Sequence, residues 1–148
     1  MSIYPPLRSA LTLALLWPAA TLAMAPLSRP AVDTAIAVGQ SAPFSGTWSA
    51  TLPTREATEP VTFLASCDRP IRIEVANDTH IFHLGPDEVE ADAAIELIAN
   101  ADGTDWQPIA GGPAFFSLWV TEDQFYLYDA VAHGEPDWSA PYVYKRCG

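Results

Sequence analysis

Short apolar segments alternate with turn residues from Phe44 to the end of the chain. The segments are rich in Val, Ile, Phe, Tyr and Trp, and they recur about every ten residues, the spacing of an antiparallel sandwich or barrel. The pattern predicts an all-β fold, a small antiparallel barrel of about eight or nine short strands, with an open β-sandwich as the alternative. The expected strands cover residues 44–52, 61–66, 71–76, 79–84, 94–99, 106–110, 114–120, 125–130 and 142–146.

The turn at Asn77 and Asp78 predicts how the strands on either side of it pair. A two-residue turn at this point places Ile73 opposite Phe82. Because side chains alternate with a period of two, His83 then belongs to the other face of the sheet, away from these apolar residues.

Asp102 and Gly103 are a strong signal for a type I′ turn. This turn is expected to fold residues 94–99 back on residues 106–110. The acidic stretch 85–93, which precedes this hairpin, is expected to form either a short helix or a loop.

A third hairpin, turning at Glu122 and Asp123, is apolar on both of its faces. An antiparallel sheet that faces water usually carries polar residues on that side. One face is therefore expected in the core, and the other is covered by a loop, a partner or a ligand, unless the pair is central and buried on both sides by the protein itself. The alternation groups Phe116, Leu118, Val120, Phe125 and Leu127 on one face. The other face, the candidate ligand or partner surface, holds Phe115, Trp119, Tyr126 and Tyr128.

The N-terminal residues have the pattern of a secretion signal. Arg8 precedes an apolar run over residues 10–25 that ends in small side chains, with cleavage expected after Ala23 or Ala25. The run is shorter than the roughly 20 apolar residues of a membrane span and contains Pro18. We expect an extracytoplasmic protein, periplasmic or secreted, with no stable membrane anchor after cleavage.

The remaining chain is expected to hold a lead and one domain. Residues 26–43 mix Ala, Ser, Pro and Gly without a sustained period, which predicts a flexible lead. Residues 44–148 then form a single β domain.

The charge balance is strongly acidic. Seven Lys and Arg stand against 18 Asp and Glu, a formal net charge of −11, and loss of Arg8 with the signal makes the mature chain one unit more negative. Nucleic acid is bound by clustered Lys and Arg, whereas the basic residues here are scattered among acids. Nucleic acid is therefore not expected as a partner.

Two cysteines, Cys67 and Cys147, occur in the chain. In an oxidising compartment an even count of two predicts one disulfide. Closing a loop of this length stabilises the fold by roughly 4 to 5 kcal/mol in the chain-entropy model. The alternative is two free thiols that serve redox chemistry or bind a metal. The sequence lacks the CxxC spacing that usually accompanies these roles.

No motif of the sequence specifies catalysis, and no metal or cofactor is predicted. G-x-S-x-G, a phosphate-binding glycine loop and a zinc-protease histidine pair are all missing from the sequence. His80 and His83 are three apart on a strand, so they point to opposite faces and cannot share an ion. The acidic stretch 129–138, which contains His133, is expected to be a solvated connection, with acid–base work or cation binding as the alternative.

Two short motifs are similar to the sequence pattern of the lipocalins and the wider calycin group. They are Phe44-Ser-Gly46-Thr-Trp48 and Tyr144-Lys-Arg146-Cys147. The resemblance implies a barrel in which Gly-x-Trp opens the first strand and a late Arg packs across the Trp. Gly46, Trp48 and Arg146 would then be structural, and a disulfide would pin the C-terminal segment. Small secreted protease inhibitors of bacteria, barrels with a free N-terminal arm, begin in the same way.

The function expected from these features is that of an exported, non-enzymatic binding protein. It would bind a small apolar molecule in the barrel mouth, or a protein on the aromatic surface. Three alternatives remain: a protease or lysozyme inhibitor that inserts residues 31–41 into its target, an accessory subunit of an envelope assembly, and a hydrolase that uses carboxylates and His133.

Overall fold

The computed structural model describes residues 29–53, 61–130 and 135–148. The described chain forms nine strands and one short 3-10 helix, and a strand occurs in each of the nine segments where the pattern predicts one. The elements are η1 (Ala42–Phe44), β1 (Gly46–Thr51), β2 (Phe63–Ala65), β3 (Ile71–Asn77), β4 (His80–Leu84), β5 (Ile95–Asn100), β6 (Gly103–Pro108), β7 (Phe115–Thr121), β8 (Gln124–Asp129) and β9 (Tyr142–Arg146). The fold is all-β, as predicted.

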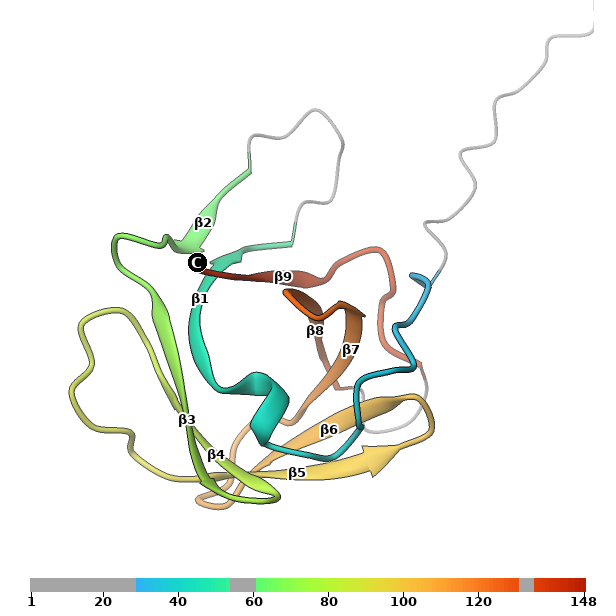
Figure 1. The fold of residues 1–148 in the computed structure, drawn as a ribbon, viewed down its shortest axis with the longest axis horizontal. Coiled ribbons are helices and arrows are strands. Elements are labelled where there is room, and N and C mark those ends of the chain that lie inside the picture. The colour runs from blue at the N-terminus through green and yellow to red at the C-terminus, as the bar shows by residue number, and fades with distance from the viewer. Residues whose placement is uncertain (1–28, 54–60, 131–134) are drawn as a thin grey trace, which may run out of the picture.

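Eight of the strands close into an antiparallel barrel (Figure 1). Neighbours follow the order β1, β3, β4, β5, β6, β7, β8, β9, and β9 pairs again with β1 through Trp48 to Thr51. The extra strand β2 pairs with Ala50 and Thr51 of β1, beyond the part of β1 that pairs with β3. Closure confirms the barrel over the open sandwich, and the architecture is consistent with a calycin-like barrel.

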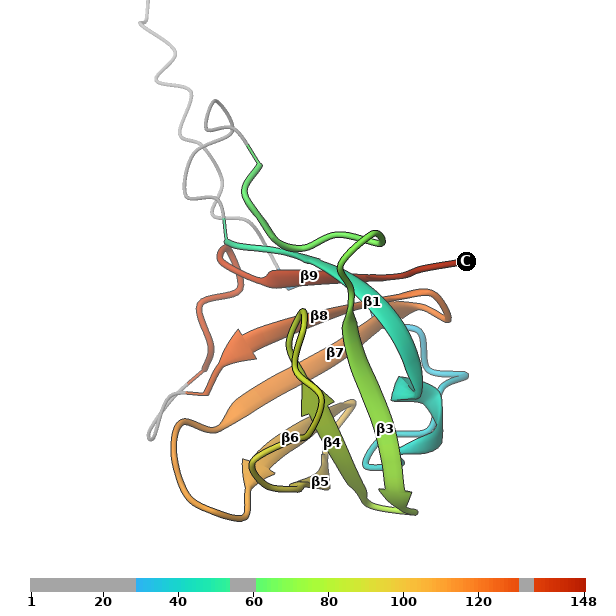
Figure 2. The same ribbon diagram turned by 90° about the vertical axis from the view of Figure 1, so that its left-hand side faces the viewer.

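A disulfide joins Cys67, which follows β2, to Cys147, which follows β9. The two Cα atoms are 5.5 Å apart across a sequence separation of 80 residues. The backbone N–H of Cys147 also donates to the carbonyl of Thr47 at 2.9 Å. The predicted pairing is confirmed, and the chain passes β1 between β9 and the C-terminus (Figure 2).

The hairpin of β3 and β4 has a different register from the predicted one. Ile73 lies opposite His83, not Phe82, because the pairing shifts between Val75 and Asn77 at a β-bulge. One extra residue in a strand reverses which face every later residue occupies. His83 therefore points into the barrel, and its predicted place on the outer face is wrong.

The hairpin of β7 and β8 turns at Glu122 and Asp123 as predicted, but it also contains a register shift, between Trp119 and Thr121. Trp119 consequently pairs with Phe125 inside the barrel. Tyr126 pairs with Leu118 on the outside. The predicted division of this hairpin into two faces is therefore wrong.

The hairpin of β5 and β6 forms where predicted, with its turn one residue earlier. Ala101, at φ 53°, and Asp102 make the turn, and Gly103 is already the first residue of β6. A Cβ on Gly103 would lie 2.2 Å from Cζ of Phe116. Glycine is needed here because a neighbouring ring approaches the backbone closely. Before this hairpin, residues 85–94 form a loop, not a helix.

The N-terminal segment, residues 29–43, is packed against the barrel. Val32 covers the outer cluster, the apolar side chains of Phe116, Leu118 and Tyr128 on the outside of β7 and β8. Asp33 N–H donates to the carbonyl of Trp119 at 2.8 Å. Gly39 N–H donates to Oγ1 of Thr104 at 2.9 Å, and Ser41 N–H to the carbonyl of Asp78 at 2.9 Å. The segment ends in η1 at one end of the barrel (Figure 1). The lead predicted over 26–43 thus contacts the barrel through residues 29–43, while 26–28 lie outside the described residues; its flexibility stays a prediction.

The predicted signal, residues 1–25, also lies outside the described residues. In the part of the chain that is described, no helix has the length and apolar character needed to cross a membrane.

Candidate functional site

One end of the barrel is filled by an aromatic plug of Phe44, Trp48, Trp119 and Phe125, all at most 2 % exposed. The ring of Phe44 lies 4.7 Å from that of Trp119 and 5.2 Å from that of Phe125. Trp48 Nε1–H donates to the carbonyl of Phe44 at 2.8 Å, which ties η1 to β1. Because these rings occupy the interior, this end offers no access to the barrel.

Arg146 closes the same end from the outside. Its guanidinium lies 4.2 Å from the centre of the Trp48 ring. It donates to the carbonyls of Ser45 at 2.8 Å and Pro43 at 3.0 Å, and to the Asp123 carboxylate at 3.1 Å. Gly46 has a φ of 130°, and a Cβ there would stand 3.0 Å from Nη1 of Arg146. Gly46, Trp48 and Arg146 thus meet at the closed end, in the arrangement that the resemblance implied.

The opposite end of the barrel contains an open cavity of about 350 Å³. The cavity lies where β1 ends and β5, β7 and β9 begin, and its walls are the inward-facing side chains of these strands and their neighbours. None of the nine lining residues carries a full charge at neutral pH. They are Leu52, Leu64, His83, Ile95, Trp106, Phe115, Leu127, Tyr142 and Tyr144.

His83 and Tyr144 form a polar pair within these apolar walls. His83 Nε2 and the Tyr144 hydroxyl are 3.2 Å apart, and the His83 ring lies 6.2 Å from each of the Tyr144 and Trp106 rings. Burial lowers the pKa of His83 below its ordinary value, against a smaller opposing effect of the Glu88 carboxylate. Burial likewise raises the pKa of the Tyr144 phenol. Both groups are therefore neutral near pH 7, and an uncharged hydrogen bond joins them.

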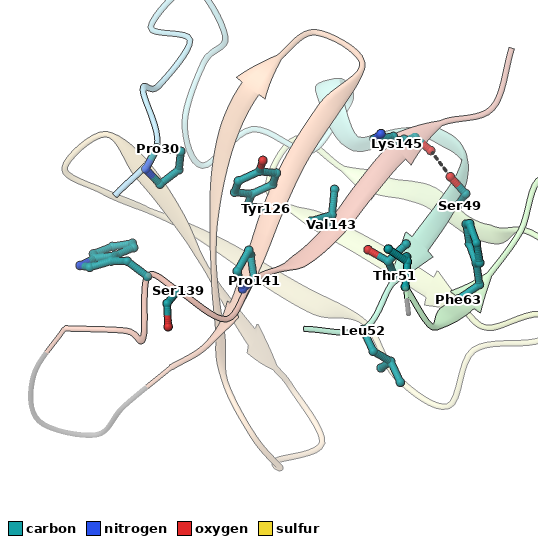
Figure 3. A pocket seen from close by; sticks show the side chains of 12 residues that line it. Pro30, Ser49, Thr51, Leu52, Phe63, Tyr126, Ser139, Pro141, Val143 and Lys145 are labelled. Atoms are coloured by element: carbon teal, nitrogen blue, oxygen red, sulfur yellow. Dashed lines mark hydrogen bonds between the residues drawn. The ribbon is translucent and has the colours of Figure 1, made fainter. Parts of the chain in front are cut away.

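A second hollow, the outer groove, lies on the outside of β1, β8 and β9 and measures about 550 Å³ (Figure 3). Tyr126, Val143 and Lys145 project into it from neighbouring strands, and Phe63 of β2 stands at its edge with 64 % of its surface exposed. Ser49 Oγ donates to the carbonyl of Lys145 at 3.3 Å along its floor. The lining of the groove is more polar than that of the cavity, since it includes a lysine and four hydroxyl side chains.

The four residues predicted as one ligand or partner surface are divided among four places. Phe115 lines the cavity, Trp119 belongs to the aromatic plug, and Tyr126 lines the outer groove. Tyr128 is 1 % exposed, and its ring lies 5.1 Å from that of Trp138. The outer face of the hairpin of β7 and β8, for which the sequence predicted a covering loop, partner or ligand, is covered by the protein's own residues Trp138 and Val32.

Sequence reasoning missed His83, Trp106 and Tyr144 as cavity residues. A clue was present in β6, where Trp106 stands between the polar Asp105 and Gln107, but in β9 Tyr144 shares its face with Tyr142 and Arg146, which gives no clear signal. For His83 no clue existed, because the bulge before Asn77 reverses the face and leaves no mark in the apolar pattern.

The described residues form no site for the alternatives of metal binding or of acid–base chemistry at His133. Within the ranges that the structure describes, no three His, Cys, Asp or Glu residues gather closely enough to hold a metal ion. His80 and His83 lie on opposite faces of β4, and His80 Nδ1 contacts Oδ1 of Asn77 at 3.0 Å. His133, on which the acid–base alternative depends, lies outside the described residues.

Comparisons of the chain with protein-family models, with curated proteins and with solved structures find no match.

Proposed function

We propose that this chain is an exported binding protein that holds a small apolar molecule in the open end of a calycin-like barrel. The observation that carries the proposal is the cavity of about 350 Å³, which opens at one end of a barrel whose other end is filled by the aromatic plug. Small-molecule sites are typically concave and apolar with a few placed polar groups, as this cavity is with its single His83–Tyr144 pair.

The size of the cavity sets the size of the ligand. At the roughly 30 Å³ that one water occupies in the liquid, the cavity holds about a dozen non-hydrogen atoms. Such a ligand would remove apolar surface from water on both sides of the contact, at about 25 cal/mol for each Å². The interiors of closed eight-stranded barrels are either filled by side chains or hold one small ligand.

A small molecule is favoured over a protein partner because the predicted partner surface does not exist as one face. Trp119 and Tyr128 are buried, and only Tyr126 reaches the outer groove. The inhibitor alternative requires a free arm, whereas residues 31–41 make hydrogen bonds to the barrel. Export is supported by the N-terminal pattern and by the disulfide, a bond that persists in oxidising compartments.

The test is saturable binding of naphthalene to the mature protein, followed by tryptophan fluorescence and calorimetry. Ile95→Trp places additional bulk in the cavity and should weaken binding at least tenfold. Ile109→Trp adds the same bulk at an exposed site outside the cavity and should leave binding unchanged. Native mass spectrometry of protein from its own host would show a bound apolar molecule directly. A wild-type protein that binds no apolar probe and carries none from its host would overturn the proposal.

A further inference from the structure

The polar groups inside the cavity offer the ligand one hydrogen-bonding position at depth. Trp106 Nε1–H is occupied, because it donates to Oγ of Ser117 at 2.9 Å. Tyr142 is half-buried and also lines the hollow next to Asp129 and Asp137, which places it at the rim. Tyr144, at 2 % exposed, and His83 are therefore the groups that a ligand meets at the base of the cavity.

The hydroxyl of Tyr144 has capacity left after its contact with His83. A phenol can donate one hydrogen bond and accept two, and the contact with His83 Nε2 uses one of these positions. If Nε2 carries the proton, the hydroxyl hydrogen is free to donate. If the hydroxyl donates to Nε2, its oxygen is free to accept. In the first tautomer the phenol can donate to a hydroxyl or carbonyl oxygen of the ligand, and in the second it can accept from a ligand hydroxyl.

The cavity has no charged side chain that could pair with a charged ligand. The nine lining side chains contain no Asp, Glu, Lys or Arg. The groups that face His83 are Tyr144 from β9 and Trp106 from β6, and the Glu88 carboxylate acts on it from the exposed loop after β4. That carboxylate is itself engaged by the backbone N–H of Gly85 at 2.6 Å. Moving an unpaired ion from water into such walls costs far more than an apolar contact returns.

We propose that the cavity selects neutral apolar molecules that carry one hydroxyl or carbonyl oxygen, and that Tyr144, held by His83, recognises this oxygen. The inference rests on the proposed function, since it assigns the ligand class of the same cavity. Tyr144 is the group that touches the ligand, and His83 is a positioning residue that fixes the orientation of the phenol.

The experiment compares three probes of one shape on the mature protein at pH 7.5: naphthalene, 2-naphthol and 2-naphthoate. Because one hydrogen bond to a buried neutral group is worth about a factor of ten, 2-naphthol should bind about tenfold more tightly than naphthalene. The carboxylate of 2-naphthoate should make it the weakest of the three. Dissociation constants come from calorimetry, with quenching of tryptophan fluorescence as the second readout.

Variants separate recognition from packing. Tyr144→Phe keeps the ring and should bind naphthalene as the wild type does, while the preference for 2-naphthol falls to about one. Tyr126→Phe removes a hydroxyl in the outer groove, outside the cavity, and should keep the preference. His83→Phe should reduce the preference and leave naphthalene binding within a few-fold of wild type.

The outcomes distinguish the two proposals. If no probe binds saturably, the proposed function fails and this inference fails with it. If naphthalene binds but the wild type does not prefer 2-naphthol, or Tyr144→Phe retains the preference, the inference alone is overturned. Tightest binding of 2-naphthoate would also overturn it, because an anion would then have a partner in the cavity.

Discussion

His83 and Tyr128 each place a polar atom where little water reaches, but only the polar atom of His83 has a hydrogen-bond partner among the described residues. His83 has the Tyr144 hydroxyl as a partner, at 3.2 Å. The Tyr128 hydroxyl, on the outside of the barrel beneath Trp138, has no hydrogen-bond partner among the described residues. A buried polar group without a partner costs free energy, whereas a paired one is close to neutral. The two residues therefore respond differently to substitution and to pH.

The stability of the protein should fall in mild acid because of His83. Burial lowers its pKa in the folded state, so the unfolded chain, in which a histidine titrates near about 6.5, binds the proton more readily. The free energy of unfolding should be constant above about pH 7 and decrease as the pH falls through about 6.5, with a slope of at most about 1.4 kcal/mol per pH unit. Urea titrations from pH 5 to 8 measure this slope. His83→Gln should flatten it and His80→Gln should not, and an unchanged slope in His83→Gln would contradict the assignment.

Removing the Tyr128 hydroxyl should stabilise the fold. Burial raises the pKa of Tyr128 to about 12, which reflects the same poor solvation that leaves the neutral hydroxyl unsatisfied. Tyr128→Phe is expected to raise the free energy of unfolding by about 1 kcal/mol, measured by urea denaturation. Tyr126→Phe, at a half-buried site on the same strand, should change it by less than about 0.5 kcal/mol. A loss of stability in Tyr128→Phe would show that the hydroxyl has a partner after all.

At the scale of elements, the closed end is built from segments that are far apart in the sequence. Arg146 at the end of β9 donates to the carbonyls of Pro43 in η1 and of Ser45 just after it, and to Asp123 in the turn between β7 and β8. The same guanidinium stacks on Trp48 of β1. One side chain thus joins β9 to β1, to the N-terminal segment and to the turn between β7 and β8, because its planar fork has five donors.

Loss of the Arg146 fork should destabilise the barrel strongly. Arg146→Met keeps the apolar stem but leaves the carbonyls of Ser45 and Pro43 without their donor, so we expect a loss of about 2 to 3 kcal/mol in the free energy of unfolding. The matched control is Lys145→Met, at the neighbouring exposed position, with a change of less than about 0.5 kcal/mol. Chemical denaturation of both variants provides the comparison, and equal effects would argue against a closing role for Arg146.

At the scale of the whole molecule, closure of the barrel and the disulfide act on the same region. β1 pairs with three strands, β2, β3 and β9, and Cys147 is bonded beyond the end of the last of these. The disulfide therefore holds the segment after β2 beside the C-terminus, where the sheet closes. The cavity lies at the other end of the barrel from the aromatic plug, so the plug can stay packed while a ligand enters.

Replacing both cysteines should lower stability without changing the cavity. For a separation of 80 residues the chain-entropy model gives a loss of about 4.5 kcal/mol for Cys67→Ala combined with Cys147→Ala. Thermal and urea unfolding measure the loss. Naphthalene binding at a temperature where the variant is folded should be unchanged, and weaker binding there would mean that the disulfide also shapes the cavity.

The sequence by itself determined the strands, the three hairpins, the disulfide and the meeting of Gly46, Trp48 and Arg146 at one end of the barrel. These features depend on local alternation, on turn residues and on short motifs, which a single chain displays directly. The tertiary structure alone decided which face each strand presents after a bulge, and so it moved His83 inward and divided Trp119 from Tyr126. It also decided that residues 29–43 cover the outer cluster, and that the barrel keeps a cavity at one end, because both depend on packing between segments distant in the sequence.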